Sequence, residues 1–435
     1  WKECARIQSV LLEVRASYGQ AKPEQVKEVT DALDKIDPLN MSLLEEKVTK
    51  HDQLAVLEEI GRHVSPETKA LLHPGTTSYD ILDTARAHLI KRAWREVMRP
   101  EVTNAVKSLC DLAENTIDVL QVGRTHLQDT SPVLFGGVLA SYAARLADRV
   151  SRCDLYFNDL RGKISGIVGT GASIDMVVGD GKSLEFEKMV LEKLGLTPDY
   201  TATQVTQKER FADVGNGIVS LMSVLGDFAN DMRMLYSSSI QEVSDRESAA
   251  RLGGSSADAG KNNPINWENI SGKVAVVEGG MRVLYEMIHS DFQRDLRGSV
   301  QARYQPGMMM AETYESFTRA NKGLKTLSVN EDRMGINLKS VRENPTEAMV
   351  AILRGEGWVH SKLGVGHDFV KAMAKEAKSS SRKLVYVCQE DKEFLELYQK
   401  LPVIKQCILQ GELERYVGSS KERANANIAY ARSVA

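Results

Sequence analysis

Apolar residues recur at helical spacing along most of this chain. One stripe begins after Asp80 and repeats every three to four residues, at Leu82, Ala85, Leu89, Ala93 and Val97. This is the pattern of an amphipathic helix. Pro100 interrupts the stripe before it resumes towards Asp118, and proline kinks or ends a helix. We therefore predict a long helix with a break near Pro100.

Two further segments are also predicted to form long helices. Residues 133–160 contain many small side chains, which let helices approach one another closely. Residues 210–241 are apolar nearly all round, and a helix without a clear polar face is buried on most sides. We expect other helices to surround it, including helices of partner subunits. More helices are predicted over 267–290 and 307–327 and, as short pieces, after Arg333.

Alternating strand patterns are nearly absent, apart from short possibilities near Gly162–Thr170. The pattern therefore predicts an all-α fold with a central bundle of long helices. Boundaries near Thr84 and Asn330 divide the chain into three expected parts. These are an N-terminal helical domain (1–84), a central helical-bundle domain (85–330) and a C-terminal helical domain (331–435).

Composition and charge narrow the functional classes. The net charge of −3 provides no overall basic field for nucleic acid, so an anion site must be a local cluster of Arg and Lys. No apolar run approaches the roughly 20 residues of a membrane helix. The five cysteines contain no C-x-x-C pair, which argues against a disulfide framework or a zinc site. The first residues do not form a signal peptide, and we expect a cytoplasmic protein.

One glycine-rich segment, Arg251–Pro264, is a candidate for chemistry. It contains three glycines, two serines and Lys261. Glycine permits unusual backbone angles, and such a loop can close over a ligand. Backbone N–H groups beside a helix start, together with Lys261, favour an anion. The alternative is a plain connector between two helices. A phosphate-loop pattern is not met, because Asn262 follows Lys261 and no strand precedes the segment.

Three of the eight histidines lie in informative strings. His126 lies in Gly123–Asp129, which we expect just before a helix that begins near Pro132; the alternative is a histidine that caps this helix. His73 precedes Thr77 and Ser78, whose hydroxyls suit the cap of the next helix. His51-Asp52 is weak evidence by itself, because polar pairs on helices are common.

Two later strings carry groups suited to a phosphate. Residues 292–303 contain Arg294, Ser299 and Arg303. Guanidinium forks match phosphate oxygens, and a serine hydroxyl adds a donor. The alternative for this string is a charged helix terminus. Residues 203–210 form a Thr-Gln-Val-Thr-Gln-Lys-Glu-Arg string in which Gln204 provides an amide.

These strings together resemble a known family. Gly-Ser-Ser-x-x-x-x-Lys-x-Asn-Pro, followed by Glu268-Asn269, is similar to the loop of the fumarase/aspartase superfamily. Six motifs between Val48 and Arg303 occur in the order found in its adenylosuccinate lyase family. Asp258-Ala259 replaces the Met-Pro that is usual in the loop. An Arg-Tyr pair near the N-terminus of that family either precedes Trp1 or is lacking here.

The resemblance implies roles for individual residues. Ser255 would be the base and His126 the acid, with Glu268 paired to His126 to tune it. Lys261 and Asn263 would stabilise the charge that develops on the substrate carboxylate. The full set of implied substrate contacts is His51, Asp52, His73, Thr77, Ser78, Thr125, Gln204, Ser256, Lys261, Asn263, Asn269, Arg294, Ser299 and Arg303. The resemblance implies no metal and no cofactor.

The reaction implied is a trans elimination that releases fumarate. The expected substrates are adenylosuccinate, giving AMP, and the succinylaminoimidazole-carboxamide ribotide of purine biosynthesis. The resemblance also implies a homotetramer whose active sites are shared between subunits, with no nucleic-acid or membrane partner. Two alternatives stay open. The first is another fumarate-releasing lyase, of argininosuccinate or aspartate, and the second is a non-catalytic structural relative.

Overall fold

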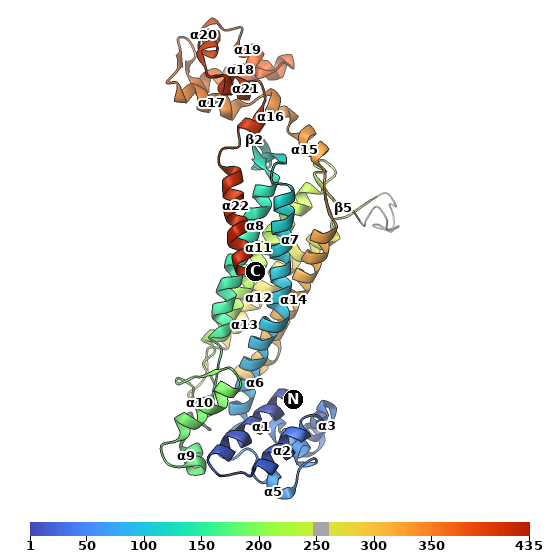
Figure 1. The fold of residues 1–435 in the computed structure, drawn as a ribbon, viewed down its shortest axis with the longest axis vertical. Helices are drawn as coiled ribbons and strands as arrows, with labels where there is room; N and C mark the ends of the chain where they lie inside the picture. Colours follow the sequence, from blue (N-terminus) through green and yellow to red (C-terminus); the bar gives the residue numbers. More distant parts are fainter. Residues whose placement is uncertain (247–260) are drawn as a thin grey trace. The chain divides into compact units, whose positions relative to one another are not determined.

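The structure, a computed structural model, describes residues 1–246 and 261–435 and consists mainly of helices. The all-α fold expected from the sequence is confirmed (Figure 1). The chain divides into two compact units. The first unit comprises residues 1–100, 151–220 and 275–314, and the second unit comprises 101–150, 221–274 and 315–435. The three domain ranges expected from the sequence stay a prediction.

The first unit is built from short and medium helices. They are α1 (Lys2–Ser17), α2 (Pro23–Ala32), α3 (Pro38–Leu44), α4 (Asp52–Gly61), α5 (Pro66–Lys69), α6 (Ser78–Ala93), α9 (Ala172–Val178), α10 (Ser183–Lys193) and α13 (Met281–Glu286). Two π-helical turns, η1 (Glu45–Thr49) and η2 (Trp94–Met98), interrupt this series. A minimal parallel pair joins β3 (Arg161–Gly162) to β4 (Thr197–Pro198).

The second unit combines helices with three short antiparallel pairs. Its helices are α15 (Glu331–Asn337), α16 (Lys339–Glu343), α17 (Thr346–Gly355), α18 (Gly366–Ser380), α19 (Leu384–Cys388), α20 (Lys392–Lys400), α21 (Val403–Leu409), the 3-10 turn η3 (Leu413–Arg415) and α22 (Ser420–Val434). Its strands are β1 (Leu120–Thr125), β2 (Gln128–Leu134), β5 (Val243–Asp245), β6 (Leu327–Val329), β7 (Val359–His360) and β8 (Gly364–Val365). The helices α17 to α21 form a cluster of their own around stacked Phe369 and Phe394 (Figure 1).

Five long helices have residues in both units. They are α7 (Arg99–Asn115), α8 (Phe135–Asn158), α11 (Glu209–Leu235), α12 (Ile265–Gly279) and α14 (Arg297–Thr326). They overlap the segments that the periodicity predicts, although α14 begins at Arg297 rather than at Gly307 and the helix expected over 267–290 is divided into α12 and α13. In the second unit, the ring of Phe228 on α11 packs edge-on against Tyr142 of α8 and Trp267 of α12. These aromatic contacts join the three helices by the geometry that ring quadrupoles favour.

Helix α11 corrects one expectation from the sequence. It buries the apolar residues that were expected to be buried, but it also has an exposed polar stripe. The stripe consists of Asp213, Asn216, Ser223, Asp227 and Asn230. These residues follow one another at spacings that keep them on one side of a helix. In the single chain, α11 is therefore amphipathic, and its packing against helices of partner subunits stays a prediction.

The interruption expected at Pro100 takes the form of a π-turn, and helical structure continues without a gap from Ser78 to Asn115. Helix α6 ends at Ala93, the π-turn η2 follows, and α7 begins with Pro100 as its second residue. The Arg99 N–H bonds to the Trp94 carbonyl across this π-turn, and proline lacks the N–H that a regular α-helix would use at the next position. Trp94 of η2 stacks on Phe157 of α8 with ring centroids 4.7 Å apart. This packing stabilises the π-turn η2.

The expectation that strands are nearly absent is wrong for residues 120–134. These residues form the β1–β2 hairpin, whose register shifts between Val122 and Arg124. The shift breaks the alternation of polar and apolar positions that a strand would show in the sequence. A Cβ on Gly123 would lie 2.6 Å from the Ser131 carbonyl oxygen, so only glycine fits there. The short strand expected near 162–170 is reduced to β3.

Two buried ion pairs hold loops of the first unit onto helix α6. Asp80 and Asp83 are fully buried, and each pairs with a buried lysine from a distant segment. Lys163 Nζ donates to Asp80, which also accepts N–H groups of Ser165 and Gly166 at 3.0 and 3.2 Å. Lys208 Nζ donates to Asp83 at 2.5 Å. Each carboxylate therefore attaches a separate loop to the same helix.

Removal of one partner tests this arrangement. Lys163→Met leaves the Asp80 charge buried without its cation, so we expect the free energy of unfolding to fall by about 3 kcal/mol in urea titrations. The matched control is Lys27→Met, which breaks an exposed pair with Asp31. That control should change stability by less than about 0.5 kcal/mol. Equal effects of the two substitutions would contradict the role assigned to the buried pair.

A third buried carboxylate, Glu187 on α10, predicts a pH dependence. It accepts the Ile164 N–H at 2.6 Å, and burial raises its pKa from 4.5 to about 7. The folded state then binds more protons than the unfolded state between these values, so this group lowers stability as pH rises from about 4.5 to about 7. Glu187→Gln should remove that contribution, roughly 2–3 kcal/mol across the window. Thermal unfolding at several pH values, compared with exposed Glu192→Gln, measures it.

Candidate active site

The residues expected to act on a substrate are divided between the two units. The first unit contains His51, Asp52, His73, Thr77, Ser78, Gln204, Arg294, Ser299 and Arg303, and the second contains Thr125, His126, Lys261, Asn263, Glu268 and Asn269. Ser255 and Ser256 lie outside the described residues. The two groups are therefore described separately below.

The start of helix α6 brings two of the expected residues together. Thr77 caps α6, and its backbone N–H donates to Asp80 Oδ2 at 2.7 Å. The capping role expected for this string is confirmed. The next residue, Ser78, places its hydroxyl 3.2 Å from His51 Nε2. His51 itself caps helix α4, since its Nδ1 accepts the Leu54 N–H. The first residues of α4 and α6 therefore lie close together, joined by the contact between His51 and Ser78.

His73 lies next to this start in a strained and partly enclosed position. Its φ of +63° is in the left-handed region, which is uncommon for residues other than glycine. Its Nδ1 lies 2.8 Å from Gln8 Nε2 and 2.9 Å from Thr76 Oγ1. Burial lowers the pKa of His73, which favours a neutral imidazole.

Arg294 is the centre of the second cluster in this unit. Its Nη1 donates to Gln204 Oε1 at 2.7 Å, and its Nη2 lies 3.5 Å from Ser299 Oγ. The guanidinium stacks on the Tyr79 ring, 3.8 Å from the centroid, and the Tyr79 hydroxyl is hydrogen-bonded to Ser299. Stacking and a directed side-chain bond hold the fork in one orientation.

A small cavity opens beside this cluster. It has a volume of about 140 Å³, and its lining includes Tyr79, Arg294 and Ser299. That volume is below the roughly 300 Å³ at which pockets for whole small molecules begin, so it suits one functional group. Arg294 Nε is buried there without a hydrogen-bond partner among the described residues. A buried donor without an acceptor favours an anion. Arg303 lines a neighbouring cavity of about 260 Å³.

His126 of the second unit lies at the tip of the β1–β2 hairpin. Thr125 pairs with Gln128, so His126 and Leu127 form a two-residue turn, with φ of +53° and +59°. Left-handed angles cost residues other than glycine about 1–2 kcal/mol each, and such strain gathers at functional sites. Both side chains are exposed. The alternative that His126 caps a helix is wrong, because α8 begins only at Phe135.

A buried carboxylate, Glu242, holds this hairpin from behind. It is fully buried and accepts hydrogen bonds from both terminal guanidinium nitrogens of Arg124, Nη2 at 2.6 Å and Nη1 at 3.1 Å. Gln121 and Asn337 donate to it at 2.7 and 2.8 Å. Although burial opposes it, this pairing raises the pKa of Arg124. The strained tip therefore extends from a strand that is fixed by charge-assisted hydrogen bonds.

The remaining expected residues surround the start of helix α12. Lys261 and Glu268 are exposed, and Asn263 is half-buried. Glu268 stands in the first turn of α12, where a negative charge is favourable. Asn269 Oδ1 is buried without a partner among the described residues. Both Glu268 and His126 are exposed in the single chain, and their pairing stays a prediction.

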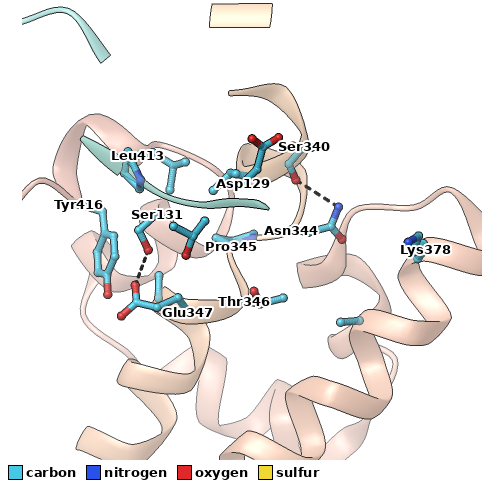
Figure 2. A pocket seen from close by; sticks show the side chains of 15 residues that line it. Asp129, Ser131, Ser340, Asn344, Pro345, Thr346, Glu347, Lys378, Leu413 and Tyr416 are labelled. Atoms are coloured by element: carbon cyan, nitrogen blue, oxygen red, sulfur yellow. Dashed lines mark hydrogen bonds between the residues drawn. The ribbon is translucent and has the colours of Figure 1, made fainter. Parts of the chain in front are cut away.

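A larger cavity of the second unit contains none of the expected residues. It measures about 480 Å³ and lies between β2 and the helices that follow residue 340 (Figure 2). Figure 2 shows Ser131 pointing to Glu347, to which its hydroxyl donates at 2.8 Å. Burial and the neighbouring Glu347 raise the pKa of Tyr416 to about 12. This lining includes one cation, Lys378, and no cluster of cations.

Sequence reasoning missed three residues that shape these clusters. Tyr79 stands within the quoted Thr-Ser string, and Arg86 follows it on the same helix face at i+7. That spacing was a usable signal. Glu242 had none, because it lies more than a hundred residues from Arg124. Within residues 1–246 and 261–435, no group of three or more His, Cys, Asp or Glu side chains could hold a metal ion.

Comparisons with known proteins show the family and, separately, the fold. A family described as "Lyase" matches residues 2–279. The adenylosuccinate lyase of Archaeoglobus fulgidus is 26% identical and covers 100% of this chain and 94% of its own length. That of Bacillus subtilis is 30% identical, over 76% of this chain and 74% of its own. The fold is similar to 3-carboxy-cis,cis-muconate lactonizing enzyme from Pseudomonas putida, with a TM-score of 0.84, 18% identity, and coverage of 100% of this chain and 94% of that one.

The hairpin geometry predicts a local effect of Glu242. In Glu242→Gln the charge opposite Arg124 is lost while the shape is kept, so amide hydrogen exchange over residues 118–134 should accelerate at least about tenfold, which corresponds to about 1.4 kcal/mol. The control is Glu331→Gln, an exposed acid in the first turn of α15. Unchanged protection of the hairpin in Glu242→Gln would refute the anchoring role.

Proposed function

The chain belongs to the lyase family, and from this premise we propose that it splits adenylosuccinate into AMP and fumarate. It is a carbon–nitrogen lyase. We extend the proposal to the succinylaminoimidazole-carboxamide ribotide of purine biosynthesis, whose reacting groups are the same. The five cysteines are free thiols, which suits a cytoplasmic site of action.

One observation supports the nucleotide substrate above the alternatives. Arg294 and Ser299 line one small cavity, and Gln204 accepts a hydrogen bond from Arg294. The Nε nitrogen of Arg294 is buried and has no partner among the described residues. A phosphate monoester would supply the missing acceptor oxygens. Argininosuccinate and aspartate carry no phosphate and would leave this donor unsatisfied. The proposal therefore assigns Arg294, Ser299 and Gln204, together with Arg303, to the phosphate end of the substrate.

The proposed elimination moves two protons. Ser255, as the alkoxide, takes the proton from the carbon beside one succinyl carboxylate, and the electrons move onto that carboxylate. The C–N bond then breaks, a C–C double bond forms, and His126 protonates the departing nitrogen. Lys261, Asn263 and loop N–H groups stabilise the doubly charged intermediate. The other substrate contacts in this proposal are Thr77, Ser78, Thr125, Ser256, His51, Asp52, His73 and Asn269.

We propose that the enzyme is a homotetramer with shared active sites. Helix α14 carries an apolar stripe of Val300, Tyr304 and Met308, which are 61%, 68% and 48% exposed in the single chain. They recur at i, i+4 and i+8 on one face, and exposed apolar patches of this kind mark association surfaces. In the tetramer, Glu268 of one subunit would meet His126 of another, which one chain by itself does not provide.

Turnover assays on the wild-type protein with three substrates, and on Ser255→Ala with adenylosuccinate, test the proposal. The wild-type protein should convert adenylosuccinate, followed by its absorbance change, and should not convert argininosuccinate or aspartate. Ser255→Ala should lose at least about a thousandfold in kcat, because the base is removed. Light scattering should give the same tetramer mass for both proteins.

The control is Ser238→Ala, which alters an exposed serine elsewhere in the chain. It should leave turnover unchanged. Near-normal turnover by Ser255→Ala would exclude the proposed base. Absence of any turnover by the wild type would favour the non-catalytic alternative.

A further inference from the structure

We propose that Arg86 is a further phosphate-binding residue of this enzyme, which no motif in the sequence had indicated. The inference rests on the proposed function and concerns the phosphate end of the same site. Arg86 projects from helix α6, seven residues after Tyr79. Its side chain is 17% exposed, so it is mostly enclosed by protein.

The position of Arg86 is the first argument. The cavity of about 140 Å³ is lined by Arg294 and Ser299, and that of about 260 Å³ by Arg303. Of the described residues that line these two cavities, only Arg86 lines both. A phosphate held by Arg294 and Arg303 together must reach the boundary between the cavities. Arg86 stands at that boundary.

The balance of charge is the second argument. Lys208 and Arg86 both pair with Asp83, and although burial raises it, these cations lower the pKa of Asp83 overall. Asp295, which also lines the smaller cavity, pairs with Arg297 at 2.6 Å. The single carboxylate of Asp83 thus faces two cations, Lys208 and Arg86. Arg294 adds a third positive charge to the wall of the cavity. The wall of the cavity therefore has excess positive charge, which a dianion would neutralise.

The donors of Arg86 are the third argument. Its Nη1 lies 3.2 Å from Asp83 Oδ1, and its guanidinium lies 5.6 Å from the centre of the Tyr79 ring. No other hydrogen bond from Arg86 is found within the described parts of the chain. The guanidinium of Arg294 also lies over the Tyr79 ring, 3.8 Å from its centre. Asp83 and Tyr79 thus orient the fork, and its remaining N–H groups can bind phosphate oxygens.

Steady-state kinetics of three variants test this assignment on the full chain. Arg86→Leu should raise the KM for adenylosuccinate at least about 30-fold, with kcat within about threefold, because ground-state and transition-state binding of the phosphate are lost equally. Arg86→Lys keeps the positive charge without the guanidinium fork, so its KM should lie between that of the wild type and that of Arg86→Leu. Asp83 keeps Lys208 and Thr206 as partners in both variants. Circular dichroism verifies that the variants are folded.

The matched control is Arg92→Leu, which removes the same charge from the same helix where it pairs with Glu3 and Glu96. Its KM should equal that of the wild type. The dephosphorylated nucleoside of adenylosuccinate provides a second control, because Arg86→Leu should change its kcat/KM less than about twofold. An equal loss on both substrates, or an unchanged KM for adenylosuccinate, would overturn the assignment.

Binding of inorganic phosphate separates this inference from the proposed function. Calorimetry on the wild type and on Arg86→Leu needs no turnover. If the wild type converts no succinylated nucleotide, the proposed function fails, but weaker phosphate binding by Arg86→Leu than by Arg92→Leu still supports the role of Arg86. Equal phosphate binding by all three proteins would overturn it.

Discussion

The two buried ion pairs on helix α6 are the interaction on which the first unit depends. Asp80 and Asp83 stand one turn apart, and each attaches a loop, through Lys163 and Lys208. Burying four charges costs free energy unless each is paired and hydrogen-bonded. These pairs meet that condition through additional N–H donors. The same helix begins with Ser78 and Tyr79, so the loops are attached beside two clusters of site residues.

The anion cavity follows from the same pairs. Lys208 is matched by Asp83, and Lys163 by Asp80, which leaves the guanidinium groups of Arg86 and Arg294 as surplus positive charge. A chain with a net charge of −3 can therefore present a locally positive cavity. Electrostatic attraction of a phosphate depends on this local arrangement rather than on the total charge.

In the second unit, His126 is positioned by backbone strain and by a buried carboxylate rather than by a buried lysine–aspartate pair. Two residues with left-handed backbone angles raise the energy of the hairpin tip, and Glu242 stabilises the strand behind it. Strand β5, which follows Glu242, pairs with β6. The position of His126 therefore depends on residues from β1, from the segment before β5, and from α15. A strained tip persists only when its surroundings determine it in this way.

The sequence by itself determined the helical class, the approximate positions of the five long helices and an irregularity near Pro100, because these follow from local periodicity and from the missing proline N–H. It also indicated Arg294, Ser299 and Gln204, since each stands in a recognisable string. The β1–β2 hairpin and the pairing of Glu242 with Arg124 were decided only by the tertiary structure. A register shift hides the strand pattern, and ion pairs between distant segments leave no local trace in the sequence.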